Sequence, residues 1–90
     1  MKRIHLIISG DVIGVGYRAW ATQRAREAGL TGWVKNREDR AVEIVAEGDD
    51  GALTSFIAAC KKGPDVAWVQ HIAVNLGKAT GEFVDFEVVY

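Results

Sequence analysis

The order of helix-like and strand-like segments is the feature that most constrains the fold of this chain. Ile4–Ser9 is rich in leucine and β-branched residues and is followed by Gly10, which predicts a short, largely buried strand. Tyr17–Ala28 carries apolar side chains at helical spacing and is followed by Gly29, which predicts a helix and its end. The chain therefore begins with a strand, a glycine-containing loop and a helix.

The remainder of the chain continues this alternation. A second helix is predicted to begin at Asp49 or Asp50, because apolar residues then follow at i, i+3, i+4 and i+7 as far as Cys60. This spacing places Cys60 in the core. A turn is predicted at Gly77–Gly81 from its composition. Four more runs have strand character: 30–36, 41–47, 66–76 and 83–90.

This order, β-α-β-β-α-β with a terminal strand, predicts an α+β fold of the ferredoxin-like sandwich type. Two helices then cover one face of an antiparallel-dominated sheet. Along 41–47 the apolar residues alternate with Glu43 and Glu47, so these glutamates are expected on a solvent-exposed face. Ninety residues are enough for one core, so residues 1–90 are predicted to form a single domain.

The predicted topology brings two candidate functional segments to one edge of the sheet. The crossover through the first helix makes the first two strands parallel, with the third strand antiparallel between them. The loop Gly10–Arg18 and the residue Asn36 therefore emerge at the same edge. Glycines in that loop allow successive amides to converge, and Arg18 lies in the first turn of a helix whose positive end favours anions. The pattern favours phosphate recognition, although the glycines can equally serve chain reversal.

Composition excludes several classes of function. Eleven Lys and Arg against twelve Asp and Glu give a net charge of −1, which argues against nucleic acid as a partner. One cysteine and two scattered histidines predict neither an intrachain disulfide nor a zinc site. The apolar stretch at the amino terminus is too short for a signal peptide or a membrane span. We therefore expect a cytoplasmic protein without metal or membrane contact.

The two histidines could be read as catalytic bases, and the topology could be read as that of an RNA-recognition module, but the sequence favours neither function. His5 and His71 fall in strands at positions that face solvent, near residues such as Glu43 and Glu87, so surface histidines are favoured over catalytic bases. An RNA-recognition module of this topology would carry aromatic residues in its first and third strands, and these strands have none.

The chain resembles the acylphosphatase family along its whole length. The family's first motif, aliphatic-x-Gly-x-Val-Gln-Gly-Val-x-aromatic-Arg, appears as Ile8 to Arg18, with Ile13 at the glutamine position. Its second motif, Gly-aromatic-small-basic-Asn-x-x-x-Gly-x-Val followed later by Gly, begins here at Gly32 and has Arg40 at the middle glycine position. In the family pattern this glycine follows an Asp in a tight turn that needs positive φ. Asp39-Arg40 is therefore expected to strain that turn by about 1 kcal/mol or to rebuild it. The matching residues of the second motif are Gly32, Trp33, Val34, Lys35, Asn36, Val42 and Gly48.

The resemblance implies hydrolysis of the carboxyl-phosphate bond of acyl phosphates, without metal or cofactor. It implies that Arg18 and the loop amides hold the phosphoryl oxygens, and that Asn36 orients the attacking water. Inorganic phosphate would be the product ligand, and a monomer is expected. The loop residues concerned are Val12, Ile13, Gly14, Val15, Gly16 and Tyr17. The alternative is a non-catalytic ferredoxin-like module that has lost activity, for which Ile13 and Arg40 would be the markers.

Overall fold

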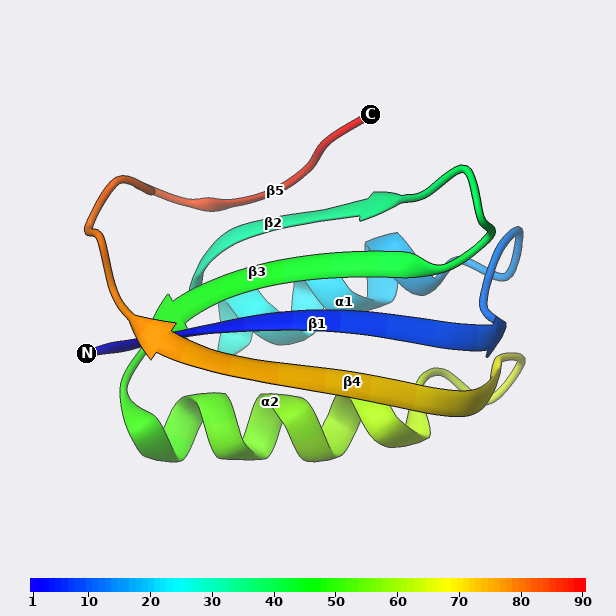
Figure 1. The fold of residues 1–90 in the computed structure, drawn as a ribbon, viewed down its shortest axis with the longest axis horizontal. Helices are drawn as coiled ribbons and strands as arrows, with labels where there is room; N and C mark the ends of the chain where they lie inside the picture. Colours follow the sequence, from blue (N-terminus) through cyan, green and yellow to red (C-terminus); the bar gives the residue numbers. More distant parts are fainter.

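The computed structural model describes residues 1–90 and places five strands in one sheet with two helices on one face (Figure 1). The predicted α+β ferredoxin-like sandwich is confirmed. The strand order is β4-β1-β3-β2-β5, and β3 pairs antiparallel with both β1 and β2, which makes β1 and β2 parallel. The elements are β1 (Lys2–Asp11), α1 (Tyr17–Glu27), β2 (Thr31–Asn36), β3 (Val42–Gly48), α2 (Asp50–Lys62), β4 (Trp68–Lys78) and β5 (Phe86–Val88).

The bounds predicted for both helices from local sequence signals agree with the structure to within about a residue. The helix α1 begins at Tyr17, directly after a glycine in the left-handed conformation, and ends just before Gly29 at φ 73°. The helix α2 begins at Asp50, with Asp49 as its N-cap residue in extended conformation. Neither helix is long and apolar enough to cross a bilayer.

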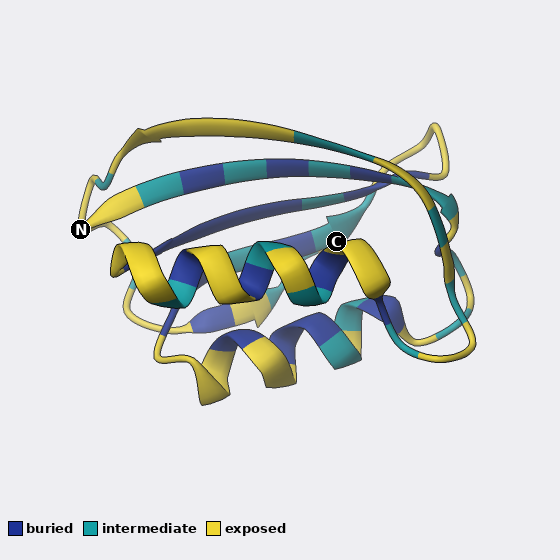
Figure 2. Ribbon diagram, turned by 90° about the horizontal axis from the view of Figure 1, so that it is seen from below, coloured by how far each residue is buried: buried dark blue, intermediate teal, exposed yellow.

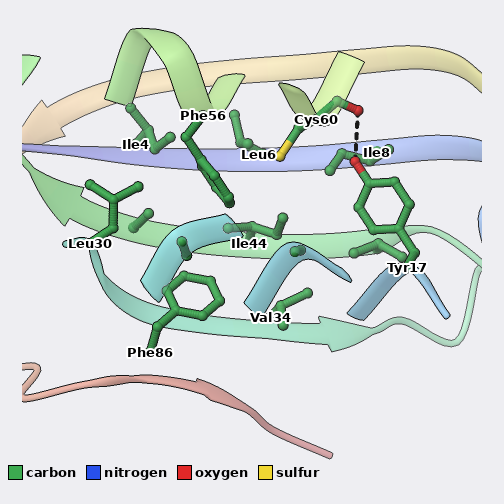
Figure 3. Packing of buried hydrophobic residues seen from close by; sticks show 14 of the residues in the cluster. Ile4, Leu6, Ile8, Tyr17, Leu30, Val34, Ile44, Phe56, Cys60 and Phe86 are labelled. Carbon is green, nitrogen blue, oxygen red and sulfur yellow. Dashed lines mark hydrogen bonds between the residues drawn. The ribbon is translucent and has the colours of Figure 1, made fainter. Parts of the chain in front are cut away.

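The core lies between the two helices and the sheet. Alternate residues of β1, Ile4, Leu6 and Ile8, are at most 1% exposed and face the helices. In Figure 2 both helices carry buried residues interspersed with exposed ones, as expected when one side of each helix packs on the sheet. Figure 3 shows Phe56 of α2 and Phe86 of β5 in this core, where their rings meet edge to face with centroids 6.1 Å apart.

The last strand joins the sheet at the edge opposite to β4. The short β5 pairs parallel with β2, with Gly32 opposite Phe86, so the connection from β4 must cross the whole sheet (Figure 1). The turn predicted at Gly77–Gly81 is wrong in its bounds, because β4 continues to Lys78 and residues 79–85 form the crossing connection.

This crossing connection corrects one prediction about the open face of the sheet. Glu47 was expected in solvent, yet it is only 2% exposed. Its carboxylate accepts hydrogen bonds from the Thr80 and Gly81 amides at 2.9 and 3.0 Å and lies 3.5 Å from the Arg3 guanidinium. The connection therefore covers the end of a face that the helices leave open.

Candidate active site

A cleft of about 200 Å³ opens at the edge of the sheet where β1 and β2 both end. These ends lie together on the right of Figure 1, where the loop after β1 leads into α1. The sequence-based prediction that the two segments share this edge is confirmed. The cleft is lined by Val12, Gly14, Gly16, Tyr17, Arg18, Ala19, Asn36, Val88 and Tyr90.

The loop between β1 and α1 leaves main-chain amides open to this cleft. Gly14 and Gly16 have φ of 77° and 79°, a left-handed conformation that costs a residue with a Cβ about 1–2 kcal/mol. Gly16 is the N-cap residue of α1, and no side chain caps the helix. The first intrahelical bond runs from the Trp20 amide to the Gly16 carbonyl, so the three amides before Trp20 have no partner within the helix. The cleft therefore meets the positive end of a helix.

Arg18 and Asn36 both reach this cleft, from different elements. Arg18 lies in the first turn of α1, and Asn36 is the last residue of β2. Both are half-buried, and neither side chain makes a hydrogen bond or an ion pair within the chain. The Arg18 guanidinium lies 5.2 Å from the centre of the ring of Tyr90, an exposed residue, and this contact does not neutralise its charge. A cation and a carboxamide are thus both available to a ligand.

The other predicted site residues divide into two groups. Val12, Gly14 and Gly16 line the cleft, whereas Ile13 and Val15 pack partly against the core and are not among its lining residues.

The Tyr17 side chain also belongs to the core. It is 1% exposed, and its hydroxyl donates a 2.7 Å hydrogen bond to the Cys60 carbonyl (Figure 3). Burial, with a smaller contribution from Cys60, raises the pKa of this hydroxyl far above its usual range. Tyr17 can therefore offer a ligand its main chain but not its hydroxyl group.

Three lining residues escape prediction from the sequence. Ala19 follows Arg18 on α1, and Val88 and Tyr90 come from the carboxyl-terminal segment. The Val89 amide bonds the Val34 carbonyl, which holds this segment beside β2 and so beside the cleft. No local pattern indicates that the last residues pair with β2, because a parallel pairing depends on contacts far apart in the sequence.

Both histidines lie outside the cleft. His5 Nε2 is 2.6 Å from the Glu43 carboxylate on the open face of the sheet, as expected for a surface histidine. His71 is also exposed, but it lies on β4, whereas Glu87 lies on β5 at the opposite edge. The expected proximity of His71 to Glu87 is therefore wrong.

The fold and this cleft define an α+β sandwich with an arginine, a carboxamide and a helix N-terminus at one edge of its sheet. The family model for acylphosphatase matches residues 4–88. An acylphosphatase of Methylococcus capsulatus is 47% identical over 99% of this chain and 97% of its own length. An acylphosphatase of Marinobacter nauticus is 48% identical over 100% of this chain and 98% of its own length.

The structural comparison agrees. The crystal structure of acylphosphatase from Bacillus subtilis superimposes with a TM-score of 0.96 at 40% identity, with both chains covered completely. The chain belongs to the acylphosphatase family. The sequence-based prediction of an acylphosphatase, a hydrolase, is confirmed, and a non-catalytic module of the same fold is not favoured.

Proposed function

We propose that this protein hydrolyses the carboxyl-phosphate bond of acyl phosphates in the cleft between the β1–α1 loop and the end of β2. The observation that carries the proposal is the meeting of Arg18 and Asn36 in one cleft of about 200 Å³ beside an uncapped helix N-terminus. This combination supplies positive charge and directed hydrogen bonds to a phosphoryl group.

The phosphoryl oxygens are held by Arg18 and by amides of the 12–17 loop, of which Val12, Gly14, Gly16 and Tyr17 line the cleft. The guanidinium offers paired, planar donors, and the amides contribute donors that are already oriented before the substrate binds. Because the amides are fixed by the backbone of the loop, they stabilise charge on the phosphoryl oxygens in the transition state without reorganising. Inorganic phosphate, which carries the same oxygens, binds at the same place as product.

Asn36 orients the attacking water. Its carboxamide oxygen accepts a hydrogen bond from the water, and its amide group donates to a phosphoryl oxygen, which aligns the water with the bond to be broken. The water oxygen forms a bond to phosphorus as the bond between phosphorus and the acyl oxygen breaks. The proton of the water passes to the phosphate, and the acyl group leaves as carboxylate.

The leaving group explains how so few side chains suffice. The conjugate acid of a carboxylate has a pKa of about 4, so the group departs as an anion and needs no general acid. Phosphoryl transfer commonly proceeds through a loose transition state, in which the protein mainly positions the reactants and compensates charge. Arg18, Asn36 and the loop amides meet both requirements.

The proposal also includes the number of domains, the oligomeric state and the location of the protein. Residues 1–90 act as a single domain, which is supported by the one hydrophobic cluster that joins both helices to the sheet. We propose that this domain acts as a monomer. One buried, unpaired cysteine suits a reducing compartment, which supports the cytoplasm as its location.

The test is hydrolysis of benzoyl phosphate, followed by release of benzoate. We expect Arg18→Ala and Asn36→Ala each to lower turnover by at least about 100-fold while the circular dichroism spectrum stays native. Arg24→Ala is the matched control, because Arg24 lies on the same helix outside the cleft, and it should retain activity. A near-normal rate in either cleft variant would remove that residue from the mechanism.

Binding is tested separately by titration with inorganic phosphate. Amide resonances of residues 12–18 should shift in the unmodified protein and respond much less in Arg18→Ala. Shifts confined to other parts of the chain would argue against this loop as the anion site.

A further inference from the structure

The hydrogen bond between the Tyr17 hydroxyl and the Cys60 carbonyl joins the two helices close to the cleft. It is 2.7 Å long and buried, and it is the only side-chain hydrogen bond between α1 and α2. Figure 3 shows it at one end of the core, away from Phe56 and Phe86. Tyr17 is the first residue of α1 and lines the cleft, and Arg18 follows it directly. The bond therefore connects the last turn of α2 with the first turn of the helix that meets the cleft.

The sequence leaves the Cys60 carbonyl without a partner in its own helix. In a continuing helix this carbonyl would accept a hydrogen bond from the amide four residues later in the chain. That residue is Pro64, which has no amide hydrogen, and α2 ends at Lys62. The Tyr17 hydroxyl supplies the missing donor. A phenylalanine in place of Tyr17 would keep the ring but leave a buried carbonyl unpaired, which is unfavourable.

The ring of Tyr17 is confined as well as its hydroxyl group. The residue is 1% exposed, and the centre of its ring lies 5.2 Å from that of Trp20. Gly63 follows α2 directly at φ 70°, and a Cβ there would lie only 3.0 Å from Tyr17 Cε2. Because the interior is closely packed, the end of α2 fixes where the Tyr17 side chain lies.

This contact acts on the groups that meet the phosphoryl oxygens. No side chain caps α1, so no local side-chain hydrogen bond fixes the direction of its first turn. The amides of Tyr17 and of the two residues after it have no partner within the helix, and the Arg18 side chain leaves from the same turn. A tilt of this turn therefore moves the amides and the guanidinium together. A misplacement of about 1 Å can lower a rate about 100-fold.

From this geometry we propose that Tyr17 is a positioning residue. Its hydroxyl, by bonding the Cys60 carbonyl, holds the first turn of α1 so that Arg18 and the free amides converge on the phosphoryl group. The Tyr17 side chain does not itself touch the substrate, because it is buried in the core. The inference rests on the proposed function, since it concerns the same cleft.

The test compares Tyr17→Phe with the unmodified protein in two assays. Titration with inorganic phosphate, followed through the amide resonances of residues 12–18, should give a Kd that is raised about threefold or more in the variant. Hydrolysis of benzoyl phosphate should show a kcat/KM that is lowered about fivefold or more, with a fall in kcat. Both assays are run under conditions in which urea denaturation shows every variant to be fully folded.

Phe56→Leu separates positioning from stability. Phe56 lies in the same core, but its ring packs against Phe86 and it lines no part of the cleft. This substitution should also destabilise the protein, yet it should leave phosphate affinity and kcat unchanged. If Tyr17 only stabilised the fold, the two variants would behave alike in both assays.

The outcomes distinguish failure of the inference from failure of the proposed function. Unchanged phosphate affinity in Tyr17→Phe overturns the inference, and so does an equal loss of affinity in Phe56→Leu. If the unmodified protein binds phosphate but does not hydrolyse benzoyl phosphate, the proposed function is wrong. The phosphate titration of Tyr17→Phe then still decides whether the hydroxyl positions the anion-binding groups.

Discussion

Arg40 shows how a single residue departs from its family's pattern without changing the fold. It is the only residue other than glycine with positive φ, at 66°, in the connection between β2 and β3. The connection is held by the Arg37 amide bonding the Ala41 carbonyl at 2.8 Å and by Asp39, whose carboxylate accepts from the Ala41 amide at 3.2 Å. The hydrogen bond from the Ala41 amide contributes most to lowering the pKa of Asp39, and the hydrogen bond from the Arg37 side chain contributes next. The turn therefore keeps the conformation that glycine would adopt.

We expect Arg40→Gly to raise the free energy of unfolding by a few tenths to about 1 kcal/mol. Glycine relieves the left-handed strain, and its greater freedom in the unfolded chain offsets part of the gain. Urea denaturation measures the change. Arg40→Ala removes the same charge but retains a Cβ, so an equal gain in that variant would assign the effect to charge instead of backbone strain.

At the scale of elements, Glu47 connects the end of β3 to the segment that crosses the sheet. Thr80 donates to its carboxylate through both its amide and its hydroxyl group, and the Gly81 amide donates as well. Burial has the largest single effect on its pKa and raises it, but these hydrogen bonds together with Arg3 outweigh burial and lower the pKa below its usual value. The ionised form therefore stabilises the crossing connection.

This lowered pKa predicts a specific loss of stability in acid. The contribution of Glu47 is fully present above its unfolded-state pKa of about 4.3 and is lost as the pH falls through the lower folded-state value. Glu47→Gln should destabilise the protein by about 1–3 kcal/mol near neutral pH, and the difference should shrink in acid. Denaturation midpoints measured between neutral pH and about pH 3 would show this. Glu82→Gln, in the same connection but exposed, should change stability little; an equal loss there would contradict the role of Glu47.

At the scale of the whole molecule, one core joins both helices to the sheet. Cys60 of α2 is fully buried in it, and the Tyr17 hydroxyl of α1 bonds the Cys60 carbonyl. Burial raises the pKa of the Cys60 thiol to about 12. The thiol is therefore both inaccessible and protonated at neutral pH.

We expect Cys60 to react with an aromatic disulfide reagent only when the molecule opens. The native protein should show no reaction on the timescale in which the urea-unfolded chain reacts completely, because exposure requires loss of the shared core. The rate should rise with urea in parallel with the unfolded fraction. Rapid reaction in native buffer would show that α2 separates from the sheet on its own.

The sequence predicts local features well because they depend on residues close together in the chain. The helix bounds at Tyr17 and Asp50 follow from glycine and aspartate signals within one turn. The positions of Arg18 and Asn36 at one edge follow from topology alone, since parallel strands end at the same side of a sheet. Tyr17 lines the cleft as the motif predicts, but the motif does not reveal that its side chain lies in the core, because burial depends on packing between distant elements.

The order of elements, the helix-facing half of the core and the loop that leads into α1 can all be predicted from the amino-acid sequence. Each of these comes from periodicity or from backbone preferences that act over a few residues. Three features emerge only in the folded molecule: the last residues pair with β2, Glu47 is covered, and Val88 and Tyr90 complete the cleft. These features depend on contacts between residues distant in sequence, whose free energy arises only once the sheet has assembled around its core.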